Sequence, residues 1–170
     1  ITENDSVVGI AASGKTPFVI GAVEEAKRLG AFTASLVCNN NSPLAGAAEE
    51  EITPIVGPEV ITGSTRMKAG TAQKIVLNMI STTVMIKLGK VYSNLMVDLN
   101  PTNEKLRSRA QDIFTLITNA DNKVAKNYLK KADYRLKEAV IMYRKDVDIK
   151  KAKLLLEEND GLLKKILTKE

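Results

Sequence analysis

Two short stretches of this sequence carry the hydroxyls, glycines and cations that suit a phosphate group or another small anion. The first is Ser13–Gly14–Lys15–Thr16, and the second is Gly63–Ser64–Thr65, followed closely by Lys68. A turn of this kind at the start of a helix offers free backbone N–H groups, hydroxyl groups and the positive end of the helix dipole. The competing interpretation is that Ser64 or Thr65 only caps the helix, which is a common role for these residues.

Charged residues beside the two turns leave similar alternatives open. Lys15, Arg66 and Lys68 could neutralise a dianion, or each could be an ordinary solvated cation. Glu59 precedes the second turn and is a candidate for binding a sugar hydroxyl or for acid–base chemistry if burial tunes its pKa, although a structural role competes with both. Neither turn has the spacing of a P-loop or of a GxGxxG dinucleotide loop.

The first turn is positioned by a strand before it and a helix after it. The apolar run Ser6–Ala12 predicts a buried strand, and Pro17 suits the first turn of a helix that Gly30 closes. Ala31–Cys38 predicts a second strand and Ile52–Val56 a third. Strand–helix–strand segments of these lengths predict an α/β fold with a parallel sheet, whose ligands bind beyond the carboxyl ends of the strands.

The second turn leads into a long apolar pattern that predicts one helix from Ser64 to Leu88. Apolar residues occur nearly all round it, so we expect burial against the sheet and against a second copy. The segments between these elements predict a short helix over 44–48, a charged surface turn over 49–51 and an irregular or briefly extended stretch over 91–99. A further amphipathic helix follows a cap at Thr102 or Asn103.

After Ala120 the pattern changes to short amphipathic helices, which predicts an α/β part over residues 1–120 and a helical subdomain over 121–170. We expect no internal repeat in either part. Residues 1–120 carry 11 Lys/Arg against 11 Asp/Glu, and residues 121–170 carry 14 against 9, which accounts for the whole net charge of +5. The lysines of residues 121–170 alternate with acidic residues and have few aromatic residues among them. This pattern favours a solvated helix surface over a nucleic-acid-binding surface.

Composition narrows the possible chemistry. The 170 residues include no His, no Trp and one cysteine, Cys38. The usual neutral-pH acid–base group and the commonest metal ligand are therefore missing, and neither a disulfide framework nor a cysteine zinc site is expected. No apolar run approaches the length needed to cross a bilayer, and no signal peptide is recognisable, so a soluble cytoplasmic protein without membrane contact is predicted.

The motifs around both turns resemble those of the N-acetylmuramic acid 6-phosphate etherases, a family built on the sugar isomerase (SIS) domain. The resemblance lies in Val8–Pro17, in Gly57–Lys74, and in Leu88–Tyr92 with Asn94–Asp98. It covers residues 5–118 closely and the helical tail in outline. It implies that residues 1–120 form the later strands of a three-layer, parallel-sheet SIS fold, followed by the small helical subdomain over 121–170.

The same resemblance implies a cytoplasmic, homodimeric, metal-free enzyme of cell-wall recycling that needs no cofactor. Such an enzyme cleaves the lactyl ether of N-acetylmuramic acid 6-phosphate to N-acetylglucosamine 6-phosphate and D-lactate, by elimination followed by hydration, with glutamate as acid and base. Ser13 and Thr16 match the phosphate-loop hydroxyls, Gly14 gives backbone access, and Ser64 with Thr65 matches the second hydroxyl turn. Glu59 and Lys68 lie in the same motif and complete the set of candidate substrate-binding residues.

One part of the family pattern has no counterpart in this sequence. The first phosphate loop and the catalytic glutamates of the etherases lie upstream of the matched motifs, so we expect the catalytic residues outside this chain and no turnover by the chain alone. Two rival functions are a non-catalytic regulator that binds sugar phosphates and an aldose–ketose isomerase on the same fold. The isomerase usually needs a His or a well-placed Glu, and the absence of His weakens that alternative.

Overall fold

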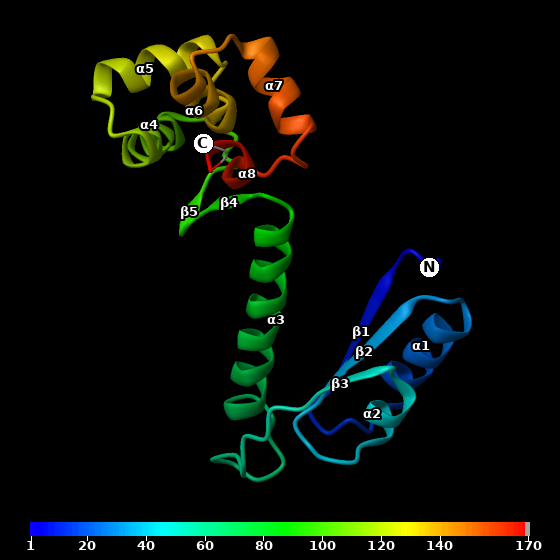
Figure 1. Ribbon diagram of the computed structural model, residues 1–170. Coiled ribbons are helices and arrows are strands. Elements are labelled where there is room, and N and C mark those ends of the chain that lie inside the picture. The colour runs from blue at the N-terminus through cyan, green and yellow to red at the C-terminus, as the bar shows by residue number, and fades with distance from the viewer. Residues whose placement is uncertain (169–170) are drawn as a thin grey trace. The chain divides into compact units, whose positions relative to one another are not determined.

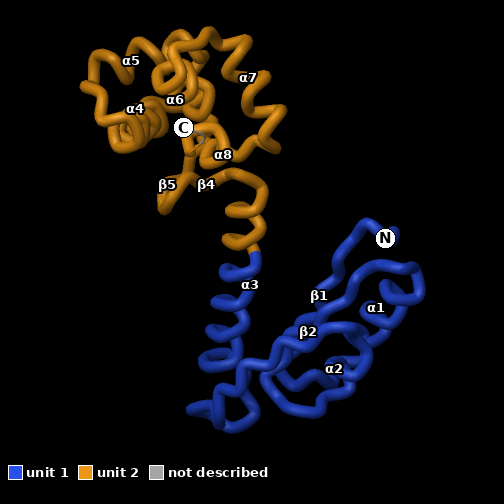
Figure 2. Tube along the Cα trace, in the orientation of Figure 1, with its two compact units in different colours: residues 1–80 blue, residues 81–170 orange. Residues whose placement is uncertain are grey.

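The computed structural model describes residues 1–168, which form two compact units (Figures 1 and 2). Unit 1 is Ile1–Ile80 and unit 2 is Ser81–Glu170. Among residues 1–168, no helix combines the length and the apolar character that a membrane span requires.

Unit 1 is built on a small parallel sheet of three strands in the order β1-β2-β3. Strand β1 is Ser6–Ile10, β2 is Phe32–Leu36 and β3 is Glu50–Ile52. The register pairs Val8 with Ala34 and Leu36 with Ile52. The predicted α/β class with a parallel sheet is therefore confirmed.

The third strand lies earlier than the sequence predicted, because Glu50 and Glu51, which were expected in a charged turn, form two of its three residues. Pro54 stops the strand, since proline cannot donate to the ladder, and the residues predicted as strand after Ile52 are irregular. An edge strand leaves one side open to water, so glutamates at this position cost little.

Helices α1, Pro17–Arg28, and α2, Pro43–Ala47, cover one face of this sheet. A Cβ on Gly9 of β1 would meet Val23 and Val19 of α1 and Leu44 of α2, so both helices lie on the side to which Gly9 faces. Val23, Leu44 and Ala26 are fully buried there. The helix predicted after the first turn is confirmed, and Pro17 occupies its first turn.

Helix α3, Lys68–Lys87, begins four residues later than predicted and is almost entirely exposed. Over residues 68–80, the part of α3 in unit 1, Ala69 is the buried residue, so the expectation that this part packs tightly against the sheet is wrong, and contact with a second copy stays a prediction. Its apolar residues are spread around the whole helix, and a single neighbouring layer could not bury them all. The most exposed of them are Ile75, Met79, Val84, Met85, Ile86 and, just beyond the helix, Leu88.

Unit 2 combines a two-stranded hairpin with five helices in the described residues. The antiparallel strands are β4, Val91–Tyr92, and β5, Leu95–Met96. The helices are α4, Glu104–Thr118; α5, Asn122–Lys131; α6, Leu136–Lys145; α7, Ile149–Glu157; and α8, Leu163–Leu167. Of the two predicted caps for α4, the structure selects Asn103, whose side chain accepts the Leu106 N–H at 2.9 Å.

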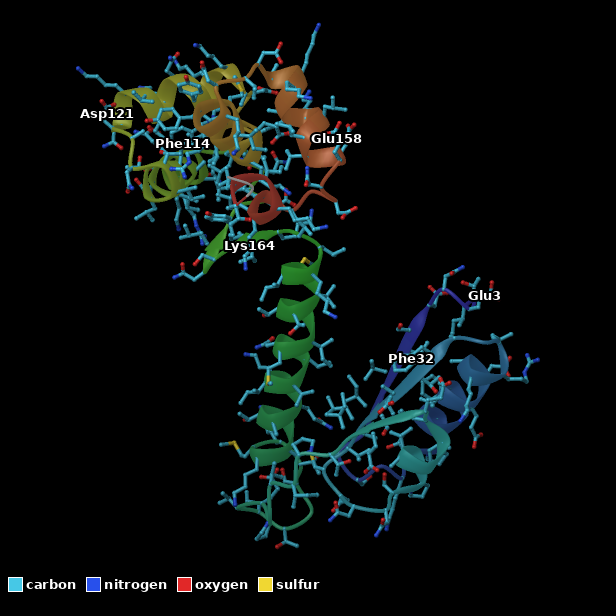
Figure 3. The ribbon with its side chains drawn as sticks, in the orientation of Figure 1. Glu3, Phe32, Phe114, Asp121, Glu158 and Lys164 are labelled. Atoms are coloured by element: carbon cyan, nitrogen blue, oxygen red, sulfur yellow. The ribbon has the colours of Figure 1, made fainter. Side chains whose placement is uncertain are left out.

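The helical core of unit 2 is centred on Phe114 of α4 (Figure 3). Its ring lies 6.2 Å from that of Tyr128 and 5.7 Å from that of Tyr143, centroid to centroid. Helix α4 thus packs with α5 and α6, so the compact units divide between Ile80 and Ser81, whereas the sequence placed a change at residue 120. The division into an SIS part over 1–120 and a helical subdomain over 121–170 stays a prediction.

The expectation of no internal repeat is wrong, because α5–α6 and α7–α8 repeat one pattern with a separation of 27 residues. Asp121 and Asp148 cap the first helix of each pair, accepting an N–H three residues on at 2.8 Å. The turns between the helices adopt the same left-handed conformation, in which the N–H groups of Tyr134 and Gly161 each donate to a leucine carbonyl at 2.7 Å. The pairs that share a position are Asp121/Asp148, Ala125/Ala152, Leu129/Leu156, Asp133/Asp160, Tyr134/Gly161, Leu136/Leu163 and Lys137/Lys164.

Candidate functional site

The turn Ser13–Thr16 lies directly beyond the carboxyl end of β1, as predicted. The Cys38 N–H donates to the Ala12 carbonyl at 2.9 Å, which carries the pairing of β1 and β2 up to the turn. Gly14 has φ +64°, and a Cβ there would collide with Ser42. Its carbonyl accepts the Leu44 N–H at 3.0 Å. The turn is therefore fixed against the start of α2, and only glycine fits at its centre.

This turn leaves the start of α1 open to a ligand. Thr16 is the N-cap of α1, and its side chain makes no capping hydrogen bond. Pro17 has no N–H, and the Val19 and Ile20 N–H groups both donate to the Thr16 carbonyl at 3.1 Å, so the Phe18 N–H is the first-turn donor that can meet a ligand. Ser13, Lys15 and Thr16 are exposed, with the Ser13 Oγ accepting the Lys15 N–H at 3.3 Å. These groups together can bind an anion at the positive end of the α1 dipole.

The start of α3 is already occupied by a carboxylate of the same chain. Glu59 accepts the backbone N–H groups of Lys68 and Ala69, each at 3.0 Å. These two hydrogen bonds, with a smaller effect from the Lys68 charge, hold the pKa of Glu59 below its ordinary value. The Lys68 ammonium group donates to the Pro58 carbonyl at 2.7 Å. Glu59 is thus an ionised cap that fixes α3, and its negative charge opposes anion binding at this helix start.

Ser64 and Thr65 do not open the helix, so both the predicted helix start and the simple capping interpretation are wrong. The Ser64 Oγ accepts the Arg66 N–H at 3.4 Å, and the Thr65 carbonyl accepts the Gly70 N–H at 3.0 Å. The N–H groups that a serine or threonine would cap are bound by Glu59 instead. The two hydroxyls lie on the irregular segment before α3, Ser64 half-buried and Thr65 exposed.

Three groups that the sequence did not single out join the end of the sheet to the second segment. The Gln73 side chain donates to the Leu36 carbonyl at 3.5 Å, which places α3 beside the end of β2. Asn39 donates to the Ala12 carbonyl at 3.1 Å. Burial, and to a smaller extent the negative charge of Glu59, raises the pKa of the Cys38 thiol. The Cys38 N–H is itself hydrogen-bonded to Ala12, the residue before Ser13, so these groups border the first turn.

The structure thus brings Ser13, Gly14, Thr16 and Glu59 to the same end of the sheet. No hydrogen bond between residues 1 and 168 links Ser64 or Thr65 to the Ser13–Thr16 turn. A sequence signal for two of the missed groups did exist, since Cys38 ends the second predicted strand and Asn39 follows it directly. Gln73 gave no such signal, because its role depends on where α3 passes.

An open apolar hollow of about 500 Å³ lies beside the start of α3. Its walls include Val56, Val60, Met67 and Ile75, with the Lys68 side chain at the edge. In the described part of the chain, no group of three or more His, Cys, Asp or Glu residues is placed to hold a metal ion. The groups available for chemistry at this end of the sheet are hydroxyls, backbone N–H groups, cations and one carboxylate.

The parallel sheet with a turn and a helix start beyond its strand end defines an α/β domain, and the family comparison agrees: the SIS domain matches residues 1–83. An N-acetylmuramic acid 6-phosphate etherase of Caldanaerobacter subterraneus is 57% identical over 96% of this chain and 53% of its own length. Etherases of Enterococcus faecalis and Bacillus subtilis are 52% and 50% identical, each over 98% of this chain and 56% and 55% of their own lengths.

The chain belongs to the N-acetylmuramic acid 6-phosphate etherase family. It spans about half the length of the curated relatives that it matches.

Proposed function

We propose that this chain supplies part of the sugar-phosphate site of a cytoplasmic N-acetylmuramic acid 6-phosphate etherase. The observation that carries the proposal is the identity of 50–57% to proteins of that name over nearly the whole chain. In such an enzyme the lactyl ether is cleaved by elimination and the product is completed by addition of water. The net change consumes one water and releases N-acetylglucosamine 6-phosphate and D-lactate.

In this proposal the phosphate is held at the start of α1. The Ser13 and Thr16 hydroxyl groups donate hydrogen bonds to phosphate oxygens. The absence of a side chain at Gly14 lets the phosphate approach the backbone closely, and Lys15 supplies a positive charge. Glu59, Lys68, Ser64 and Thr65 shape the neighbouring segment and complete the candidate substrate-binding set. The acid–base glutamates belong to the part of the etherases that this chain does not match, and neither a metal nor a cofactor takes part.

Binding of the product tests the phosphate site. In an NMR titration with N-acetylglucosamine 6-phosphate, we expect the amide signals of Lys15, Thr16 and Phe18 to shift, because those groups surround the proposed phosphate position. N-Acetylglucosamine without phosphate should leave them in place. Equal responses to both sugars would contradict the proposal.

Lactate release tests the location of the catalytic groups. We expect the chain alone to release no D-lactate from N-acetylmuramic acid 6-phosphate, even at high protein concentration. Turnover would mean that an acid–base group within these 170 residues has been overlooked, and Glu59 would be the first to substitute.

We further propose that two copies associate through the exposed second half of α3. Val84 and Leu88, which are four residues apart and so share one face, are 46% and 56% exposed, and exposed apolar surface of this kind is typical of an interface. Light scattering should report a dimer that Val84→Glu dissociates. Leu154→Glu, at a residue of α7 that is 43% exposed, is the matched control and should leave the mass unchanged.

A further inference from the structure

Helices α4 and α5 pack together in unit 2 (Figure 1), and a polar hollow of about 450 Å³ is lined by residues of both. Four of its polar lining residues are spaced three or four apart and therefore share one face of α4: Glu104, Arg107, Ser108 and Gln111. Lys126 of α5 and Tyr134, in the turn after α5, complete the polar lining. A volume of this size is typical of sites that bind small molecules.

Tyr134 has a backbone conformation that bulky residues rarely adopt. Its φ is +56°, in the left-handed region that favours glycine. In the turn between α7 and α8 the equivalent position is occupied by Gly161, with φ +70°. The turn geometry therefore does not explain the tyrosine, because glycine makes the same turn without strain. Strained residues of this kind cluster at ligand sites, so the role of the ring is to be found in the hollow.

The ring of Tyr134 holds the Arg107 side chain in place. The guanidinium carbon of Arg107 lies 4.7 Å from the ring centroid, which is a cation–π contact. Stacking of this kind uses the flat face of the guanidinium group and leaves its N–H edge available to an oxyanion. Within residues 1–168, no carboxylate lies within ion-pair distance of Arg107 or of Lys126. The hollow thus has two positive charges that no direct contact neutralises.

The other polar groups of the hollow suit a phosphate attached to a hydroxylated carbon chain. A phosphate monoester carries a charge of about −1.5 to −2 at neutral pH, which matches two cations. The Gln111 Nε2 group donates to the Asn122 carbonyl at 3.3 Å, so its Oε1 atom is left as an acceptor. The Glu104 carboxylate is a second acceptor in the same lining. Glu104 repels a bare anion, but it can accept hydrogen bonds from the hydroxyl groups of a polyol.

We propose that this hollow binds a small phosphorylated polyol. Arg107 and Lys126 hold the phosphate, and the Ser108 hydroxyl donates to it. Glu104 and Gln111 accept hydrogen bonds from hydroxyl groups of the carbon chain. Because the ligand contacts both helices and the turn after α5, its binding stabilises unit 2. The proposal uses residues of unit 2 alone and does not depend on the phosphate site proposed at the start of α1.

NMR titration with three probes tests the proposal. In protein with isotope-labelled tyrosine rings and arginine side chains, we expect sorbitol 6-phosphate to shift the Tyr134 ring signals and the Arg107 Nε–H signal until both saturate. Sorbitol should leave these signals in place, because it carries no charge for the two cations. Inorganic phosphate should bind at least about tenfold more weakly than sorbitol 6-phosphate, since it has no carbon-chain hydroxyl groups for the two acceptors.

Three variants test the assigned roles. Arg107→Met and Lys126→Met should each weaken sorbitol 6-phosphate binding by about tenfold, the effect of losing a hydrogen bond between charged groups. Tyr134→Gly should keep the fold, because Gly161 makes the equivalent turn, and should weaken binding because Arg107 is no longer held by the ring. The Arg107 Nε–H signal reports binding in the Tyr134 variant, and the Tyr134 ring reports it in the other two.

Arg109→Met on α4 and Lys123→Met on α5 are the matched controls. Both residues are exposed and lie outside the lining of the hollow, so the affinity should stay unchanged. The proposal is overturned if sorbitol 6-phosphate leaves the Tyr134 and Arg107 signals in place, if sorbitol alone shifts them, or if the controls weaken binding as much as Arg107→Met. Inorganic phosphate that binds as tightly as sorbitol 6-phosphate would overturn the assignment of a polyol phosphate.

Discussion

Two segments of unit 1 lead into helices at the same end of the sheet, yet they satisfy the helix starts in different ways. At Ser13–Thr16 the turn is fixed by Gly14 against α2, and the start of α1 carries no side-chain cap. At the other segment, Glu59 reaches across nine residues to cap α3. One helix start can still accept an anion, and the other already holds one.

Segments with the same types of residue can have different roles in this fold. Hydroxyls and glycines occur in both segments, so composition alone gives them the same function. The position of one carboxylate distinguishes them, because a negative charge at a helix start takes the N–H groups that a phosphate would need. We therefore propose the first segment as the phosphate site, and assign to the second the role of fixing the start of α3.

The largest effect is expected from Gly14→Ala. The new methyl group would collide with Ser42 and hold alanine at a positive φ, so we expect a loss of about 2–4 kcal/mol in the free energy of unfolding. Gly63→Ala is the control: φ is +88° with open space around it, and only the backbone cost of about 1–2 kcal/mol applies. Urea unfolding measures both, and equal losses would mean that the contact with Ser42 does not fix the turn.

A matched pair of serine variants compares the two segments directly. Ser13→Ala should weaken binding of N-acetylglucosamine 6-phosphate by about 1–3 kcal/mol, the range for a hydrogen bond to a charged group. Ser64→Ala should cost less, although the sequence alone predicts the same loss for both. Isothermal titration measures the two affinities. A larger loss at Ser64 would reverse the assignment of the phosphate site.

The cap formed by Glu59 predicts a pH dependence. Its pKa is lowered in the folded state, so its stabilising effect is complete above the unfolded pKa and is lost as pH falls through the lower folded value. Glu59→Gln should therefore lower the Tm at neutral pH, and the gap to the unsubstituted chain should shrink as the pH is lowered below the ordinary glutamate pKa of about 4.3. Glu24→Gln, on the exposed side of α1, should leave no gap at either pH. A gap of equal size at both pH values would contradict an ionised cap.

The smallest effect concerns the two lysines. Lys15 is exposed beside the open helix start, whereas the Lys68 ammonium group is bound to the Pro58 carbonyl. Lys15→Met should weaken sugar-phosphate binding by up to about 1 kcal/mol, and this loss should shrink at high salt because the site is exposed. Lys68→Met should change the affinity less. A salt-independent loss at Lys68 would place the phosphate at α3 after all.

Much of unit 1 near the first turn could be predicted from local sequence. The strand before Ser13, the helix start at Pro17 and the need for Gly14 follow from short-range patterns, and the structure confirms them. The 27-residue repeat was also present in the sequence, in the paired aspartates and leucines of α5–α6 and α7–α8. Divergence at Tyr134 and Gly161 obscured it, and the shared turn geometry made it recognisable.

The sequence by itself determined the family, the α/β class and the two segments that could meet a sugar phosphate, because these depend on residue types at fixed spacing. Only the tertiary structure decided which helix start is free. The hydrogen bond from the Lys68 N–H to the Glu59 carboxylate and that from the Gln73 side chain to the Leu36 carbonyl join residues distant in the sequence. A local pattern contains no information about such contacts. The exposure of α3 was likewise decided by packing, since apolar side chains show only that a partner is needed.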